Sequence, residues 1–413
     1  MPRRILLDVT PLRESRDFRL LFTGQLISTL GNQMTVVAIP FQVYELSHSS
    51  LQVGAISLAQ LVPFIVGAML AGPIGDSSDR RHMMLWTAVA LALTSAALAL
   101  NASMAHPSLI VLYAISSLAA GFMGFSNTAR SASVPGLVTR GQISAALAMT
   151  QIIIQVGTIV GPALSGLLLG IGLPLVFALD AGSFVVAFVM TVLMAPLPPG
   201  AHSGLSYWES TKEGLRYLKS RQALQGVYAV DINAMVFGLP RALFPAMRVH
   251  VFHADTVVLG LLYAAPGIGA LIGAVTTGWV ARLKRQGWAV IVAVVVWGTA
   301  IAFFGLVHVL WVCLVMLGLA GWADVISAVL RNTILQTSIP ERLRSRMSSI
   351  QMAVVQGGPR LGDMEAGAVA TATSLEFSIV SGGLACIAGA AVVGLMLPGF
   401  RRHASVDPGE IPV

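Results

Sequence analysis

The sequence predicts an all-α membrane protein in which twelve transmembrane helices form two pseudo-symmetric six-helix bundles. Three observations lead to this fold class: an apolar composition, charges that fall in clusters, and an internal repeat. Of the 413 residues, 56% are hydrophobic and 10% are charged, whereas soluble domains have about 25% charged residues. Twelve helices of about 20 residues need about 240 mostly apolar residues, and the chain has about 231. This composition excludes a soluble globular fold.

The charged clusters divide the chain into six apolar intervals, each about two membrane spans long. Turn-forming or polar residues interrupt every interval near its middle, so each interval predicts one helical hairpin. The intervals cover residues 20–75, 82–129, 141–208, 222–281, 286–330 and 347–400. The predicted tips are Glu45–Ser50, Asn101–Pro107, Gly170–Pro174, Arg248–Asp255, His308 and Ser374–Glu376.

Basic residues gather at the same end of all six hairpins. Five of the 25 precede the first span, two follow the last, and fifteen lie between the intervals. By the positive-inside bias, we expect a multi-pass protein of the cell (inner, cytoplasmic) membrane with both termini and these loops in the cytoplasm. The fifteen residues are Arg80, Arg81, Arg130, Arg140, Lys212, Arg216, Lys219, Arg221, Arg282, Lys284, Arg285, Arg331, Arg342, Arg344 and Arg346.

One long linker divides the spans into six and six. Prolines end the sixth span near Pro196, and Ser206–Ser220 then mixes aromatic with charged side chains. This pattern predicts an amphipathic helix at the membrane interface. We therefore expect an N-terminal bundle at residues 1–195, a cytoplasmic linker at 196–222, a C-terminal bundle at 223–400 and a cytoplasmic tail at 401–413.

The two halves repeat each other. Three glycines recur at a constant offset of 206 and one loop recurs at an offset of 205, which indicates a duplicated unit. Parallel repeats of this kind are typical of transporters whose substrate site lies between the halves near the bilayer midplane. The matched residues are Gly54, Gly67 and Gly72 with Gly260, Gly273 and Gly278, and Ser133–Pro135 with Ser338–Pro340.

With this plan, the chain resembles the major facilitator superfamily over essentially its whole length. Residues 72–81 read GPIGDSSDRR, close to the superfamily loop pattern G-x-x-x-D-[RK]-x-G-R-[RK]. The resemblance implies a cytoplasmic gate motif of Gly72, Asp76, Arg80 and Arg81, in which Asp76 lies at a helix N-terminus of the other half. Ser77 and Asp79 depart from the pattern, so the contact of this motif with the other half is expected to be weaker than in the family. The alternative is a basic loop that obeys only the orientation bias.

The fifth span carries a second motif. Gly157, Gly161, Pro162 and Gly166 give G-x-x-x-G-P-x-x-S-G, which resembles a motif of superfamily exporters that importers generally lack, and so implies efflux. The glycines permit close helix approach, and the proline bends the helix. A generic packing seam is the alternative reading. The eleventh span repeats the motif at residues 357–363, with charges added.

The fourth span lacks one expected residue. Drug and proton antiporters of the superfamily often carry an arginine four residues before a glycine there, whereas Ser117 precedes Gly121 in this chain. The resemblance therefore implies that proton coupling uses other residues.

Several charged residues lie at membrane depth, where each needs a partner or an aqueous cavity. They are Asp180, Asp231, Arg241, Asp324, Arg360, Asp363 and Glu365. Counting about 1.5 Å per residue places Asp324 and Arg360 near mid-depth, and we predict an ion pair. Asp363, Glu365 and Asp231 are the candidate proton-coupling acids, with a structural contact between helices as the alternative for each. Asp180 is expected to be structural.

The first span places polar side chains on one side of an apolar helix. Gln25, Ser28, Asn32 and Gln33 recur at roughly helical spacing. This predicts a cavity-lining face, with interhelical hydrogen bonds as an equal alternative. We take Gln25, Asn32 and Arg241 as candidate substrate-cavity residues, although Arg241 could instead reach toward lipid head groups.

Five stretches along the chain resemble the enterobactin (siderophore) exporter group and macrolide-type efflux proteins. The resemblance implies a secondary active exporter, driven by proton antiport, of a siderophore or a similar amphipathic metabolite. A multidrug or macrolide efflux pump is one alternative, and a non-transporting membrane sensor or scaffold is another. The stretches are residues 17–19, 51–54, 241–245, 260–265 and 333–340.

Other functions lack their sequence patterns. No phosphate-binding loop appears, so we expect no ATPase activity and no required ATPase subunit. No nucleophile, base and orienting group cluster as in an enzyme, and His and Cys residues are scattered, so no metal or other cofactor is expected. The net charge of +7 is assigned to cytoplasmic loops, not to nucleic-acid binding. The expected partners are a small-molecule substrate and the lipid bilayer.

Overall fold

The computed structural model describes residues 8–197, 215–340 and 343–404, which are helical with short connections. Ten helical segments in these ranges are long and apolar enough to span a membrane. Two more helices, α2 (Arg16–Ser47) and α14 (Arg344–Ala372), have 32 and 29 residues and carry more polar side chains. Together they give the predicted twelve spans and confirm the predicted all-α fold class.

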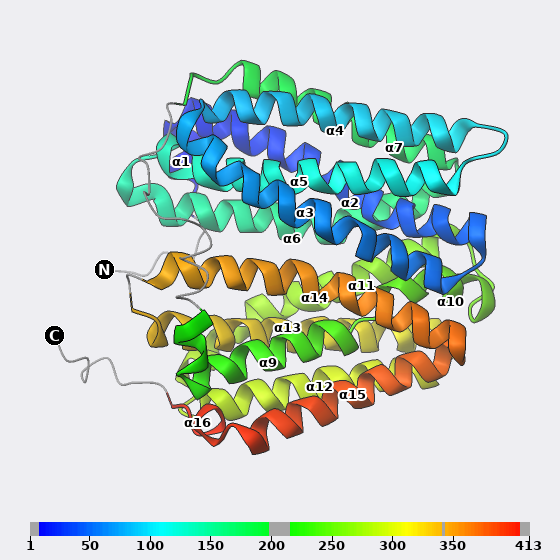
Figure 1. Cartoon of the computed structure of the whole chain (residues 1–413), viewed down its shortest axis with the longest axis vertical. Helices are drawn as coiled ribbons and strands as arrows, with labels where there is room; N and C mark the ends of the chain where they lie inside the picture. Colours follow the sequence, from blue (N-terminus) through cyan, green and yellow to red (C-terminus); the bar gives the residue numbers. More distant parts are fainter. Residues whose placement is uncertain (1–7, 198–214, 341–342, 405–413) are drawn as a thin grey trace. The chain divides into compact units, whose positions relative to one another are not determined.

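The helices follow one another with short connections (Figure 1). In the first half these are α1 (Thr10–Glu14), α2, α3 (Ser50–Ser77), α4 (Arg80–Ser103), α5 (Leu109–Leu137), η1 (Arg140–Gln142), α6 (Ile143–Leu169) and α7 (Leu173–Val192). In the second half they are α9 (Gln222–Phe237), η2 (Arg241–Leu243), α10 (Phe244–His250), α11 (Thr256–Thr276), η3 (Thr277–Arg282), α12 (Gln286–Leu306), α13 (Leu310–Ser338), α14, α15 (Leu375–Met396) and α16 (Pro398–Arg401).

All six predicted hairpin tips coincide with breaks between helices. The first tip lies where α2 ends and α3 begins, and the others lie between α4 and α5, α6 and α7, α10 and α11, α12 and α13, and α14 and α15. Local capping supports these breaks. Ser108 and Ser374 accept hydrogen bonds from the backbone at the starts of α5 and α15, as expected for N-cap serines.

The opposite ends of two helices differ from the prediction. α5 continues to Leu137 and α13 to Ser338, so Arg130 and Arg331 lie inside helices, and their assignment to loops was wrong. Near these ends, hydroxyl side chains bond to carbonyls one turn back, so their polar groups are satisfied within the helix. These bonds include Ser131 to Asn127, Ser133 to Ala129, Thr333 to Val329 and Thr337 to Thr333.

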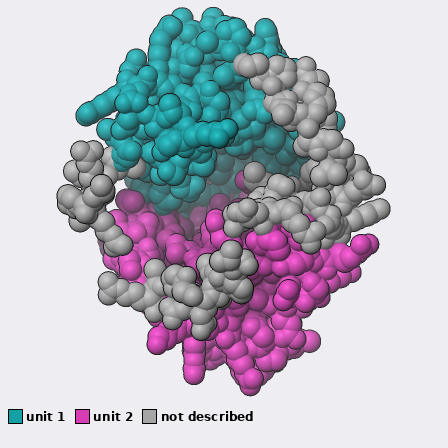
Figure 2. All heavy atoms as spheres, turned by 90° about the vertical axis from the view of Figure 1, so that its left-hand side faces the viewer, with its two compact units in different colours: residues 1–48, 59–203, 254–264 teal, residues 49–58, 204–253, 265–413 magenta. Residues whose placement is uncertain are grey.

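The chain divides into two compact units (Figure 2). Unit 1 contains residues 1–48, 59–203 and 254–264, and unit 2 contains 49–58, 204–253 and 265–413. The first turns of α3 therefore belong to unit 2, and the first turns of α11 belong to unit 1. The predicted interfacial helix at Ser206–Ser220 falls mostly outside the described residues. Its last turns, at 215–219, are helical.

Unit 1 is a bundle in which α7 packs against both α2 and α4. A buried cluster containing Phe18, Met83, Phe125 and Met149 joins the helix ends. The outward face is apolar: Ile110, for example, is 82% exposed. An exposed apolar face of this kind is expected where lipid surrounds a helical bundle.

In unit 2, α12 packs between α13 and α15, and α9 packs on α14. The Trp297 indole donates a 2.6 Å hydrogen bond to the carbonyl of Gly238, where α9 ends. The Tyr217 hydroxyl donates to the carbonyl of Ser338 at the end of α13, over 2.9 Å. Both contacts satisfy carbonyls that a helix end leaves without a partner.

Candidate functional site

Unit 2 contains an arginine shared by two carboxylates. On α13, Arg331 Nη1 lies 2.6 Å from Oδ1 of Asp231 on α9, and Arg331 Nη2 lies 3.5 Å from Asp324 Oδ1. Asp324 and Arg331 are seven residues apart, so they share one face of α13. The exposed fractions are 0% for Asp231, 5% for Arg331 and 34% for Asp324. The buried ion pair is therefore open on the Asp324 side.

Polar side chains from two helices extend this cluster. Gln351 Nε2 on α14 donates to Asp231 Oδ2 over 3.3 Å. The Ser327 hydroxyl and Gln351 Oε1 are buried without a hydrogen-bond partner. Arg331 contacts both carboxylates, so a proton on either acid leaves Arg331 paired with the other, and Arg241 also acts electrostatically on Asp324. Such an arrangement can exchange a proton without leaving a buried charge uncompensated.

The predicted partner of Asp324 was wrong. Its ion pair is with Arg331, whereas Arg360 donates to the carbonyl of Gln356 over 2.9 Å and interacts electrostatically with Asp363. Counting residues gives the depth of a side chain but not the rotation of its helix. Asp324 and Arg360 match in depth, but Asp324 faces a residue two turns along its own helix.

A second acid lies where the seventh span breaks. The amide of Ala242 donates to Asp363 Oδ1 over 3.2 Å, and the side chain of Ser57 forms a further hydrogen bond to Asp363. Arg241 and Arg360 both act electrostatically on this carboxylate. The structure therefore brings together the predicted coupling acid Asp363 and the predicted cavity residue Arg241. Glu365 is partly exposed on the same helix.

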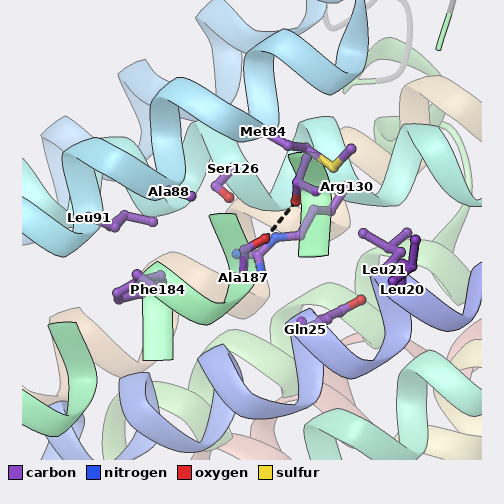
Figure 3. A pocket seen from close by; sticks show the side chains of 12 residues that line it. Leu20, Leu21, Gln25, Met84, Ala88, Leu91, Ser126, Arg130, Phe184 and Ala187 are labelled. Carbon is purple, nitrogen blue, oxygen red and sulfur yellow. Dashed lines mark hydrogen bonds between the residues drawn. The ribbon is translucent and has the colours of Figure 1, made fainter. Parts of the chain in front are cut away.

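Unit 1 contains a pocket around Arg130 of α5 (Figure 3). Gln25 lines this pocket and Asn32 does not, and their place in a substrate cavity stays a prediction. Arg130 lies on the fourth span, thirteen residues after Ser117 and therefore not at the position of the antiporter motif. The full lining is Leu20, Leu21, Gly24, Gln25, Met84, Ala88, Leu91, Ser126, Arg130, Phe184, Ala187 and Thr191.

Asp180 on α7 connects three helices of unit 1. Its Oδ2 accepts hydrogen bonds from Thr35 of α2, over 2.7 Å, and from Ser95 of α4, over 2.8 Å. The residue is 1% exposed. These contacts agree with the structural role expected for Asp180.

The predicted gate motif lies where the start of α4 meets the end of α7. Asp79 caps α4 by accepting from the Arg81 amide, and it accepts a second bond from the amide of Leu197 over 3.0 Å. The Arg81 guanidinium bonds to the carbonyls of Thr191 and Val192 at the end of α7, where a cation is favoured. The departure at position 79 thus supplies a helix cap.

The remaining motif residues lie around this connection. Arg80 donates to the carbonyl of Ala132 on α5. On α3, a Cβ atom at Gly72 would meet nothing within 4 Å. Asp76 is in the last turn of α3, and its side chain is outside the described part of the structure, so its gate role stays a prediction.

The exporter motif is a close-packed seam. A Cβ atom at Gly157 would lie 2.7 Å from the Thr29 side chain, and one at Gly161 would lie 2.4 Å from the Gln33 side chain. One at Gly166 would lie 2.9 Å from the backbone of Gly260 on α11. The bend residue Pro162 is buried within α6. The geometry explains these glycines by helix packing, and the link to efflux direction stays a prediction.

Sequence reasoning missed two arginines, Arg130 and Arg331. For Arg331 a signal was present: Asp324 lies seven residues earlier, on the same helical face, and no turn-forming residue separates them. For Arg130 the signal was weaker. It consists of the hydroxyl-rich stretch 126–133, which contains no glycine or proline and so favours a continued helix.

Comparison with known proteins adds the family. The transmembrane secretion effector family matches residues 8–408. The enterobactin exporter EntS of Citrobacter koseri is 30% identical over 395 residues, which cover 95% of this chain and 93% of that protein. EntS of Shigella boydii is 27% identical over 404 residues, which cover 98% of this chain and 97% of that protein.

Solved structures support the same fold. A bacterial homologue of the iron transporter ferroportin, in an inward-facing state, matches with a TM-score of 0.69 and 16% identity, and the match covers 94% of this chain and 99% of that one. This likeness bears on the fold alone. The chain is a multi-pass membrane exporter of the major facilitator type, and it belongs to the transmembrane secretion effector family.

Proposed function

We propose that the protein exports a siderophore, or a similar anionic and amphipathic metabolite, in exchange for protons by alternating access. The substrate class is supported by the relatives named as enterobactin exporters, which this chain matches over at least 93% of their length. The proton coupling rests on one observation, the contact of Arg331 with both Asp231 and Asp324.

The proposed coupling step is a change of partner at Arg331. Without a proton, Arg331 is shared by two carboxylates. With a proton on Asp324, which is 34% exposed, Arg331 pairs with Asp231 alone. Asp324 is the loading position because the Asp231 carboxylate is fully buried. Asp363, between Arg241 and Arg360, is the second candidate for this role.

The proposed orientation follows from the basic loops. We place both termini and the loop around Arg80 and Arg81 in the cytoplasm of a cell membrane, in accordance with the positive-inside bias. Residues 1–195 and 223–400 are the two proposed bundles whose alternating movement exposes the substrate to each side. No nucleotide hydrolysis and no further cofactor enter this cycle, because the proton gradient drives export.

The first test measures the substrate. Siderophore inside and outside iron-starved cells is determined by mass spectrometry in a deletion strain and in its complemented parent. Retention inside the deletion strain, reversed by complementation, is the expected result. An unchanged distribution with altered susceptibility to macrolides would replace the siderophore with drug efflux. No change in either would favour the sensor or scaffold alternative.

The second test measures the coupling. Purified protein is reconstituted into liposomes with a pH-sensitive dye inside, and substrate-dependent proton flux is followed under an imposed pH gradient. D324N is expected to abolish the flux while the protein remains folded. The matched control is E376Q, which changes an acid at an exposed hairpin tip and should keep the flux. Wild-type flux in D324N would eliminate Asp324 as the coupling acid.

A further inference from the structure

The clearest unexplained group is Arg130 on α5. Its Nη1 lies 3.3 Å from the Ser28 hydroxyl and its Nη2 lies 3.9 Å from the Met123 sulfur. Its Nε is buried without a hydrogen-bond partner. Within the described residues, Arg130 forms no ion pair.

This arrangement differs from those of Arg81 and Arg331. Arg81 binds carbonyls at a helix end, and Arg331 binds two carboxylates. Arg130 lies seven residues before the end of α5, about 10 Å inside the helix. A cation at this depth is costly unless a partner compensates it. Among the described residues, its hydrogen-bond partners are a hydroxyl and a thioether, and neither carries a charge.

The pocket beside Arg130 is small and mixed in character. Its polar lining comes from Gln25, Ser126, Arg130 and Thr191, and apolar side chains such as Leu91 and Phe184 surround them (Figure 3). The cavity volume is about 20 Å³, which is about the space for one water-sized group. The pocket can therefore admit one oxygen atom at the tip of a ligand's head group but not a whole metabolite.

We infer that this pocket is a subsite that binds one anionic oxygen group, a carboxylate or a phenolate, of the exported substrate. Arg130 offers Nε and Nη2 on one edge of its guanidinium, which matches the two-oxygen geometry of a carboxylate. Gln25 adds an amide that can donate to the same group. This inference rests on the proposed export function, and it assigns the recognition of substrate charge to unit 1.

The test uses a pair of probes that differ in charge. Benzoate and benzamide share a ring and a planar head group, but only benzoate is an anion. The thermal unfolding temperature of the full-length protein is measured in nanodiscs of phosphatidylcholine against increasing concentrations of each probe. A ligand that binds the folded state raises this temperature. Benzoate is expected to raise it, and benzamide is not.

Three variants locate the effect. R130Q is expected to weaken benzoate binding about tenfold or more, because a charge-assisted hydrogen bond is lost, and R130K should retain part of it. R140Q is the matched control, because Arg140 is exposed in η1, and it should bind benzoate as the wild type does. Equal benzoate binding in R130Q and wild type, or equal effects of the two probes, would overturn the inference.

Two further results separate the possible causes. The same titration in nanodiscs that contain phosphatidylglycerol tests an anionic lipid head group as the occupant. An Arg130-dependent stabilisation by that lipid, with no effect of benzoate, would contradict a substrate subsite. Benzoate binding that depends on Arg130 in a protein that exports no siderophore would leave the anion site in place and remove the proposed function. Normal siderophore export by R130Q would leave the proposed function in place and remove the substrate subsite.

Discussion

The two units treat buried charge differently. In unit 1, Arg130 and Asp180 are each held by neutral groups: Arg130 by Ser28 and Met123, and Asp180 by hydroxyls from α2 and α4. In unit 2, the buried charges meet each other, as Arg331 does with Asp231 and Asp324. On the proposed function, unit 1 would receive charge from a ligand and unit 2 would exchange protons among its own groups.

The repeat survives in the backbone rather than in these charges. Gly54 and Gly260, related by the offset of 206, make equivalent close approaches. A Cβ atom at Gly54 would lie 2.4 Å from the carbonyl of Asp363 on α14, and one at Gly260 would lie 2.6 Å from the carbonyl of Pro162 on α6. Helix packing thus tolerates little change, whereas polar residues could diverge after duplication.

The largest effect is expected from removing the shared cation of unit 2. R331M leaves Asp231 buried without its partner, and breaking a buried pair in this way costs about 3–5 kcal/mol. We expect a clear loss of unfolding free energy in detergent. The double variant D231N/R331M should recover part of it. Equal stability of R331M and wild type would show that the network contributes nothing to folding.

The second effect tests the close helix packing that recurs within each unit. G260A places a Cβ atom against the α6 backbone, and overpacking of this kind costs about 1–3 kcal/mol. G182A is the control, because a Cβ atom there would meet nothing within 4 Å. The unfolding temperature should fall in G260A and stay level in G182A. A fall of the same size in both would show that the close contact at Gly260 is not the cause, since alanine favours a helix over glycine and helix propensity alone would raise both temperatures.

A smaller effect is expected for the buried acid of unit 1. D180N keeps the shape of the side chain and leaves no cation unpaired, so it should cost less than about 2 kcal/mol, chiefly from hydrogen bonds that an amide accepts less strongly than a carboxylate. Chemical unfolding of D180N beside R331M measures the contrast. A larger loss in D180N than in R331M would reverse the comparison.

The smallest effect is expected for the stability of R130Q. Since Arg130 has no charged partner within the described structure, removing its charge relieves a desolvation cost. The unfolding temperature should stay unchanged or rise, even though ligand binding weakens. A marked fall would indicate that the contacts of Arg130 with Ser28 and Met123 are structural.

Much of the fold followed from the sequence, because hydropathy and turn residues decide where helices begin and end at the hairpin tips. The α5 and α13 ends did not follow, since hydroxyl groups satisfied within a helix look polar in the sequence. The candidate site was predicted only in part. Asp231, Asp363, Arg241 and Gln25 all have contacts that fit polar sites, but the partner of Asp324 depends on helix rotation, which residue spacing alone cannot give.

The division of α3 and α11 between the units has a consequence for how each half of the chain folds. Residues 49–58 complete unit 2, and residues 254–264 complete unit 1, so each half of the gene encodes part of the other half's fold. A protein made from one half alone would therefore need a second copy to supply the missing helical turns. A hybrid that exchanges one half at the linker is therefore expected to fold only where these residues fit the other half.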